Sequence, residues 1–315
     1  MAKGPNGASG QDEGRGKDRP SNKYAAKKAA SERLAAQRAA QQRAERRRNV
    51  LVAGGSTLGV IIVVVVIVVV GLATKKNGTS SGSGNAVVGA SSAVTDGVSA
   101  AATGTLSQSS PEFATISGPP SAITGDALKG PDGKPQVLYV GAEYCPYCAA
   151  TRWPLAVALA RFGTFDNLKT TYSADSDQAG PHIPTLSFHG SSYTSQYVDF
   201  VGVEHQDGVG KPLENLTNDQ NKLFENLGGG AYPFIDFGGK WMQKGSSFDP
   251  NILKGMTPDE VAKTLTDSNS KQGKTVQAGA DVFTAIICEI DGGQPSDVCT
   301  APSVTAASKA LNGGK

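Results

Sequence analysis

The sequence of 315 residues contains few cysteine, histidine and aromatic residues. It has 4 Cys, 3 His and 6% aromatic residues. So few cysteines exclude a small domain built on a disulfide framework, and 39 glycines are far below the one third that collagen requires. The histidines, at 182, 189 and 205, lack the helical spacing of paired metal ligands, so we expect no metal site. Hydrophobic residues make up 38%, which predicts one or two ordinary folded domains.

Charge is absent from residues 50–73, and residues 60–70 are almost entirely Val and Ile. A helix needs about 20 apolar residues to cross a bilayer, so this segment predicts a transmembrane helix. The alternative is a cleaved signal peptide. The 49 residues before the segment and its length favour an uncleaved anchor in the lipid bilayer instead.

The charges on the two sides of this segment differ. Residues 1–49 carry 13 Lys and Arg against 5 Asp and Glu, whereas residues 74–315 carry 17 against 23. The positive-inside rule therefore predicts a cytoplasmic N-terminus and an extracytoplasmic C-terminal part, in a single-pass protein of the cell membrane. We interpret residues 1–49 as a solvated flank that sets this topology; binding to anionic lipid or nucleic acid is the alternative, and we expect no nucleic acid partner.

Composition also suggests the domain boundaries. Residues 74–110 are Gly, Ser, Ala and Thr with almost no large apolar side chain, which predicts a flexible linker. A folded domain is expected over residues 111–303, followed by a disordered tail over residues 304–315.

A C-x-x-C motif, Cys145-Pro146-Tyr147-Cys148, lies between an expected strand at residues 135–141 and an expected helix at residues 149–162. A thiol at a helix N-terminus is stabilised as thiolate, the attacking species in disulfide exchange. The motif therefore predicts thiol–disulfide chemistry, with Cys145 as nucleophile and Cys148 as resolving thiol. A zinc half-site would need Cys288 and Cys299, which lack this spacing, and an inert disulfide is the other alternative. No metal or organic cofactor is needed.

Residues 137–153 around this motif resemble a thioredoxin active site. Residues 111–303 as a whole resemble a thioredoxin-like family of unknown function, found as membrane-anchored proteins in actinobacteria and archaea. The resemblance rests also on residues 193–197, 232–240, 287–288 and 293–295, and on Cys299. It implies an α/β class, with a thioredoxin-like fold carrying an insertion after the motif.

The resemblance further implies a cis-proline beside the thiols that helps to bind substrate. Pro184 and Pro233 are the candidates. We favour Pro233, because residues 234–237 read as a strand, Gly238-Gly239 as a hairpin turn and Thr257-Pro258-Asp259-Glu260 as a helix start. Tyr232, Pro233, Pro146 and Tyr147 are therefore the expected substrate-binding residues.

Three further residues have expected roles. Glu143, two residues before Cys145, is a candidate proton relay, with a solvated carboxylate as the alternative. Cys288 and Cys299 are expected to form a structural disulfide, because residues 281–290 read as a helix and residues 291–295 as a turn that brings Cys299 back. The alternative is a second redox pair that exchanges electrons with Cys145.

The expected function is that of a membrane-anchored thiol–disulfide oxidoreductase acting on cysteines of secreted or membrane proteins. A quinone-linked membrane thiol oxidase is the expected recycling partner. A reductase for cytochrome c maturation and a non-catalytic thioredoxin-like binding or scaffold protein are the alternatives. The motif does not decide the redox direction.

Overall fold

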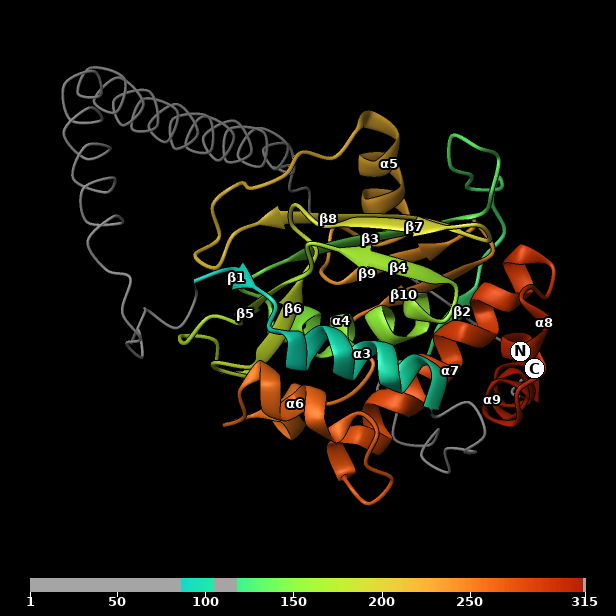
Figure 1. The fold of residues 1–315 in the computed structure, drawn as a ribbon. Coiled ribbons are helices and arrows are strands. Elements are labelled where there is room, and N and C mark those ends of the chain that lie inside the picture. Colours follow the sequence, from blue (N-terminus) through green and yellow to red (C-terminus); the bar gives the residue numbers. More distant parts are fainter. Residues whose placement is uncertain (1–85, 105–117, 314–315) are drawn as a thin grey trace, which may run out of the picture. The chain divides into compact units, whose positions relative to one another are not determined.

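A five-stranded sheet forms the centre of the computed structural model, which describes residues 86–104 and 118–313 (Figure 1). Its strand order is β2 (Ser121–Ala122), β10 (Trp241–Lys244), β9 (Phe234–Phe237), β3 (Gln136–Ala142) and β8 (Asp199–Gln206). Strand β3 is parallel to β8 and antiparallel to β9, and β9 forms a hairpin with β10. The protein is thus of mixed α/β class, as its sequence predicts.

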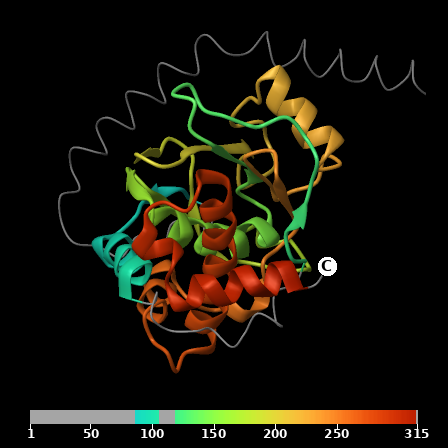
Figure 2. The ribbon, with the colours of Figure 1, turned by 90° about the vertical axis from the view of Figure 1, so that its right-hand side faces the viewer.

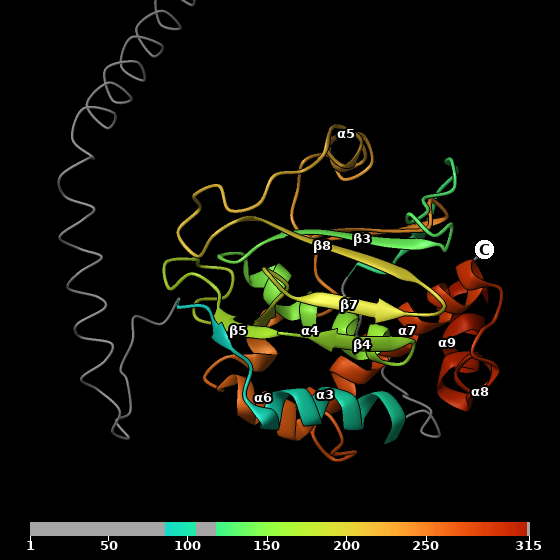
Figure 3. The ribbon, with the colours of Figure 1, turned by 45° about the horizontal axis from the view of Figure 1, so that its top comes forward.

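Helices cover both faces of this sheet (Figures 1 and 3). Helices α4 (Pro146–Ala160) and α7 (Lys271–Asp291) lie on one face, and α5 (Asn218–Asn226) lies on the other. The side chains of β3 alternate between the two cores: Tyr139 packs in the core with α4 and α7, and Leu138 in the core with Phe224 of α5. Seen from the side, α5 lies apart from the C-terminal helices (Figure 2).

The segment between α4 and β8, which includes the insertion expected around residues 181–197, contributes to two small antiparallel sheets. Strand β4 (Gly163–Asp166) pairs with β7 (Ser192–Ser195), and β5 (Lys169–Tyr172) pairs with β6 (Pro184–Ser187) and with β1 (Val88–Gly89). Strand β6 packs on α4, where the Trp153 indole donates a hydrogen bond of 3.0 Å to the Pro184 carbonyl. Strand β6 thereby connects this segment to α4.

The flexible-linker prediction is wrong for residues 92–104. They form helix α3 (Ser92–Gly104), which buries Val94, Val98, Ala101 and Ala102 against α4 and α6 (Pro258–Thr264). A Cβ atom on Gly97 would lie 2.9 Å from the Ala262 carbonyl oxygen, so a small residue is needed where α3 meets α6. Small apolar residues at helical spacing build this face even though none is large. Residues 74–85 and 105–110 of the expected linker lie outside the described residues.

The disordered-tail prediction is also wrong. Helix α9 (Pro302–Gly313) continues past Ser303, buries Val304 and Ala307, and packs on α7. The short helix α8 (Ser296–Cys299) precedes it, and Cys299 forms a disulfide with Cys288 across 5.6 Å between Cα atoms. The C-terminal helices are therefore part of the folded domain.

The expected transmembrane segment at residues 50–73 and the basic segment at residues 1–49 lie outside the described residues. In residues 86–104 and 118–313, every helix is too short or too polar to cross a bilayer.

Candidate active site

The turn from β3 into α4 places the two thiols of the C-x-x-C motif. The Ala142 carbonyl accepts a 3.2 Å hydrogen bond from the Cys145 amide. Cys145 is the N-cap of α4, and its Sγ accepts the amide hydrogen of Cys148 at 3.3 Å. Pro146 occupies the first helical turn, where its missing N–H costs no helix hydrogen bond. The motif therefore sits at the start of a helix, as its sequence predicts.

The two thiols differ in exposure and in acidity. Cys145 is 5% exposed and Cys148 is fully buried. The pKa of Cys145 is lowered, because hydrogen bonds from the Cys148 side chain and amide and the positive charge of Arg152 together outweigh burial. Burial raises the pKa of Cys148 well above its usual range, and its hydrogen bond to Cys145 adds to the rise. Cys145 is thus the better nucleophile near neutral pH, and Cys148 keeps its proton.

The peptide bond between Tyr232 and Pro233 is cis, and Pro233 leads directly into β9, the neighbour of β3. The Tyr232 side chain packs against the cluster of Ala142, Cys145 and Cys148. In the part of the chain that the structure describes, the other cis bond precedes Pro295, which the sequence did not indicate, and the bond before Pro184 is trans. Pro233 therefore directly follows the residue that packs against the thiols.

A histidine holds the Tyr232 side chain in this place. The Tyr232 hydroxyl and His205 Nδ1 are 2.5 Å apart, and the ring of Phe224 stacks on that of Tyr232 with 5.2 Å between centroids. Burial raises the pKa of Tyr232 to about 12, so its hydroxyl keeps its proton near neutral pH. The sequence analysis treated His205 as one of three scattered histidines and missed this contact.

A buried ion pair lies behind the thiols and was not anticipated. Arg152 of α4 donates from Nε to Glu204 Oε1 at 2.8 Å and from Nη2 to Glu204 Oε2 at 2.6 Å. Its Nη2 also donates a hydrogen bond of 2.8 Å to the Ala142 carbonyl oxygen. The same oxygen accepts the hydrogen bond from the Cys145 amide. Both side chains are fully buried. The signal in the sequence was an arginine within an otherwise apolar helix.

The parallel pairing of β8 with β3 places Glu204 and His205 beside the motif. Gly141 lies opposite Glu204, but Ala142 lies opposite Gln206, so β8 has one extra residue at this point. Side chains alternate along β8, so Glu204 points to Arg152 on the α4 side, and His205, like Val203, faces the α5 side, where it meets Tyr232 and Phe224.

Glu143 is not a solvated carboxylate. Its side chain is only 2% exposed, and its Oε1 accepts a 2.7 Å hydrogen bond from Ser187 of β6. Burial raises the pKa of Glu143, opposed by the Ser187 hydrogen bond. Glu143 is therefore a buried carboxyl whose hydrogen bond is made with β6.

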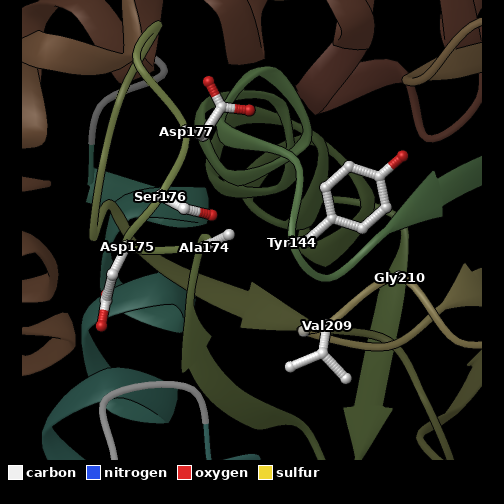
Figure 4. A pocket seen from close by; sticks show the side chains of 8 residues that line it. Tyr144, Ala174, Asp175, Ser176, Asp177, Val209 and Gly210 are labelled. Atoms are coloured by element: carbon white, nitrogen blue, oxygen red, sulfur yellow. The ribbon is translucent and has the colours of Figure 1, made fainter.

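Two hollows flank the thiols. One, of about 560 Å³, lies between Tyr144, the loop that contains Ala174, Asp175 and Asp177, and the loop that contains Val209 (Figure 4). The other, of about 440 Å³, is lined by both Tyr147 and Tyr232. Tyr147 is 43% exposed, whereas Pro146 is buried. Of the expected substrate-binding residues, Tyr147 and Tyr232 thus face open space beside the motif.

The remaining cysteines are separate from this site in their bonding. Because Cys288 and Cys299 bond to each other, Cys145 and Cys148 are the free thiols of the described residues. Residues 86–104 and 118–313 also contain no group of three His, Cys, Asp or Glu side chains placed to hold a metal ion. A zinc site that uses all four cysteines is therefore excluded.

A family model matches part of the chain. No curated protein and no solved structure matches the chain. A family model described as a domain of unknown function, DUF929, matches residues 129–289, just over half of the chain. The match includes β3, the C-x-x-C motif, Glu204 and Pro233. The chain belongs to this family of domains of unknown function.

Proposed function

We propose that the protein is a thiol–disulfide oxidoreductase that acts on cysteines of secreted or membrane proteins. The observation that supports it most is the position of Cys145 at the start of α4. There its Sγ accepts a hydrogen bond from the Cys148 amide, and Tyr232, which precedes the cis bond to Pro233, packs against it. This environment lowers the pKa of one thiol and raises that of the other, which is what successive roles in disulfide exchange require.

The strand arrangement supports a thioredoxin-like fold for the domain. Strand β3 leads into the motif, β8 returns parallel to it, and β9 follows the cis-proline antiparallel to β3. The hairpin partner β10 and then the helices α6 and α7 come next. This order is the one that the resemblance to thioredoxin-like proteins implies.

The proposed reaction has two steps. The Cys145 thiolate attacks a substrate disulfide, forms a mixed disulfide and releases one substrate thiolate, which takes up a proton. Cys148 then loses its proton and attacks the Cys145 sulfur; the second substrate thiolate leaves and is protonated. Two electrons pass from the enzyme dithiol to the substrate, and the same steps in reverse oxidise a substrate dithiol. Glu143 is the proposed proton relay.

The proposed location is outside the cytoplasm, on an anchor at residues 50–73. This proposal rests on the uncharged segment and the basic residues before it. A quinone-linked membrane thiol oxidase is the proposed recycling partner for oxidation. The reduction potential of the Cys145–Cys148 pair decides the direction, since known pairs range from about −120 mV for oxidants to about −270 mV for reductants.

The test is disulfide turnover by the purified full-length protein. With insulin as disulfide substrate and dithiothreitol as reductant, the wild-type protein should accelerate reduction and Cys145→Ala should not. A variant with Cys288→Ala and Cys299→Ala is the matched control, since it removes two cysteines without touching the motif, and should keep activity. Equal rates for wild type and Cys145→Ala would contradict the proposal and favour the non-catalytic alternative.

A further inference from the structure

The Tyr232 ring contacts both the thiols and the core on the α5 side of the sheet. It packs against the cluster that contains the two thiols and against the cluster that contains Phe224. It stacks on the Phe224 ring with 5.2 Å between centroids. It also lines the hollow of about 440 Å³ beside Tyr147. The position of this one ring therefore shapes the wall of the hollow next to the thiols.

The residues just before Tyr232 offer little to hold the ring. Helix α5 ends at Asn226, and the chain then runs through Gly228, Gly229, Gly230 and Ala231 to Tyr232. Glycine carries no side chain, so only the methyl group of Ala231 could pack on the ring from this segment. The contacts that fix the ring come from other elements.

His205 makes the polar contact of this ring. Its Nδ1 lies 2.5 Å from the Tyr232 hydroxyl oxygen, and the two rings meet edge to face with 6.0 Å between centroids. Either group can be the donor, because a hydroxyl and an imidazole nitrogen can each donate or accept. His205 lies in β8, which pairs with β3, and its carbonyl accepts a 3.0 Å hydrogen bond from the Leu213 amide. The Tyr232 ring is thereby tied to a strand of the central sheet.

We propose that His205 is a positioning residue that fixes the Tyr232 ring for substrate binding. This inference rests on the proposed function, in which Tyr232 binds the protein substrate beside Cys145. A side chain that is already held in place does not have to be ordered when the substrate binds, so less binding free energy is lost. Without His205 the ring is free to leave the wall of the hollow, and the protein binds its substrate more weakly.

This role is separate from the reactivity of the nucleophile. The amide that donates to Cys145 Sγ belongs to Cys148 of α4, whereas His205 contacts Tyr232 and Phe224 on the other side of the sheet. Loss of His205 should therefore raise the KM for a protein disulfide. The rate at which the Cys145 thiolate reacts with a small reagent should stay unchanged.

A double-mutant cycle on the purified full-length protein tests this role, with reduction of insulin by dithiothreitol as the assay. His205→Leu and Tyr232→Phe each remove one side of the contact, and each should raise the KM for insulin about fivefold, as expected for the loss of one hydrogen bond. Because both changes remove the same contact, the double variant should be no worse than either single variant. His205→Asn keeps a polar atom close to the position of Nδ1 and should recover most of the loss. The kcat should change little in all of them.

Two controls separate positioning from other effects. Alkylation of Cys145 by iodoacetamide reports the reactivity of the thiolate without a disulfide substrate, and its rate should equal that of wild type in every variant. Tyr193→Phe is the matched control for the loss of a tyrosine hydroxyl. Tyr193 is also half-buried, but its hydroxyl donates to the Leu159 carbonyl at 2.8 Å, so its KM should remain that of wild type.

The outcomes that would overturn the inference are distinct from failure of the proposed function. Effects that multiply in the double variant would show that His205 does not act through the Tyr232 hydroxyl. An unchanged KM in Tyr232→Phe, or slower alkylation that accounts for the loss, would also overturn the inference. If His205→Leu does not fold, the comparison of Tyr232→Phe with Tyr193→Phe still decides. A wild-type protein that does not reduce insulin would overturn the proposed function and this inference with it.

Discussion

Neighbours within one helical turn make the two thiols of the motif chemically different. Cys145, which is 5% exposed, receives hydrogen bonds from residues 147 and 148, which stabilise its charge. Cys148 is one turn deeper, where burial disfavours its charge. The same residue type thus supplies a nucleophile and a protected second thiol because of position alone.

The raised pKa of Glu143 predicts a pH dependence of stability. The folded protein favours the protonated carboxyl, so between the ordinary value of 4.5 and the raised pKa it binds more protons than the unfolded chain. The contribution of this group to the free energy of unfolding therefore falls as pH rises through that window and is level above it. Glu143→Gln, which resembles the protonated form, should lack this fall.

Urea unfolding of wild type and Glu143→Gln at a series of pH values measures this contribution. The difference in unfolding free energy should grow in favour of the variant as pH rises from 4.5. A difference that stays constant with pH would contradict the raised pKa.

Removing one partner of the buried Arg152–Glu204 ion pair should lower the free energy of unfolding strongly. Arg152→Ala leaves Glu204 buried without its bidentate partner and should destabilise the domain by about 3–5 kcal/mol. Replacing both by apolar residues, as in Arg152→Met with Glu204→Leu, should recover much of that loss. Chemical denaturation measures both, and a double variant less stable than Arg152→Ala would contradict this account. Lys222→Ala, which breaks an exposed pair with Asp219, is the control and should change little.

At the scale of elements, α3 extends the domain beyond the expected boundary. Val98→Ala removes two buried methyl groups from the contact of α3 with α6 and should destabilise the domain by about 1.5–3 kcal/mol. Ser99→Ala on the exposed face of the same helix should change stability by less than about 0.5 kcal/mol. Equal, small effects from both would indicate that α3 does not contribute to the folded core.

The elements with a strong local signal were predictable from the sequence. Thr257 and Glu260 form the reciprocal capping box at the start of α6, and Gly238 and Gly239 turn the β9–β10 hairpin with positive φ. Helices α3 and α9 were missed because composition dominated the interpretation: both are rich in Ala and Ser, and their burial depends on contacts with α4, α6 and α7. Such tertiary contacts leave only a short periodic trace in the sequence.

The candidate site likewise has features that the sequence predicts and features that depend on the tertiary structure. The C-x-x-C motif and the place of Pro233 follow from local sequence and from the resemblance. Glu204 and His205 come from β8, and only its parallel pairing with β3 brings them beside the motif. Their roles depend on strand register, which a single sequence without relatives does not determine.

At the scale of the whole molecule, the folded domain is larger than the family match. Residues 129–289 contain the thiols and the central strands β3, β8, β9 and β10, but α3, α8 and α9 lie outside the match and pack on α4, α6 and α7 within it. The Cys288–Cys299 disulfide likewise joins the end of the matched region to α8. The helices outside the match therefore support the face of the domain opposite α5.

The central claim, that Cys145 exchanges disulfides with protein substrates, is tested most directly by trapping. In Cys148→Ala the mixed disulfide at Cys145 lacks its resolving thiol and should accumulate. Non-reducing gels of cells that produce this full-length variant should show complexes with secreted or membrane proteins that a reductant releases, and Cys145→Ala should show none. Absence of complexes in Cys148→Ala, or complexes formed through Cys148 in Cys145→Ala, would contradict the account.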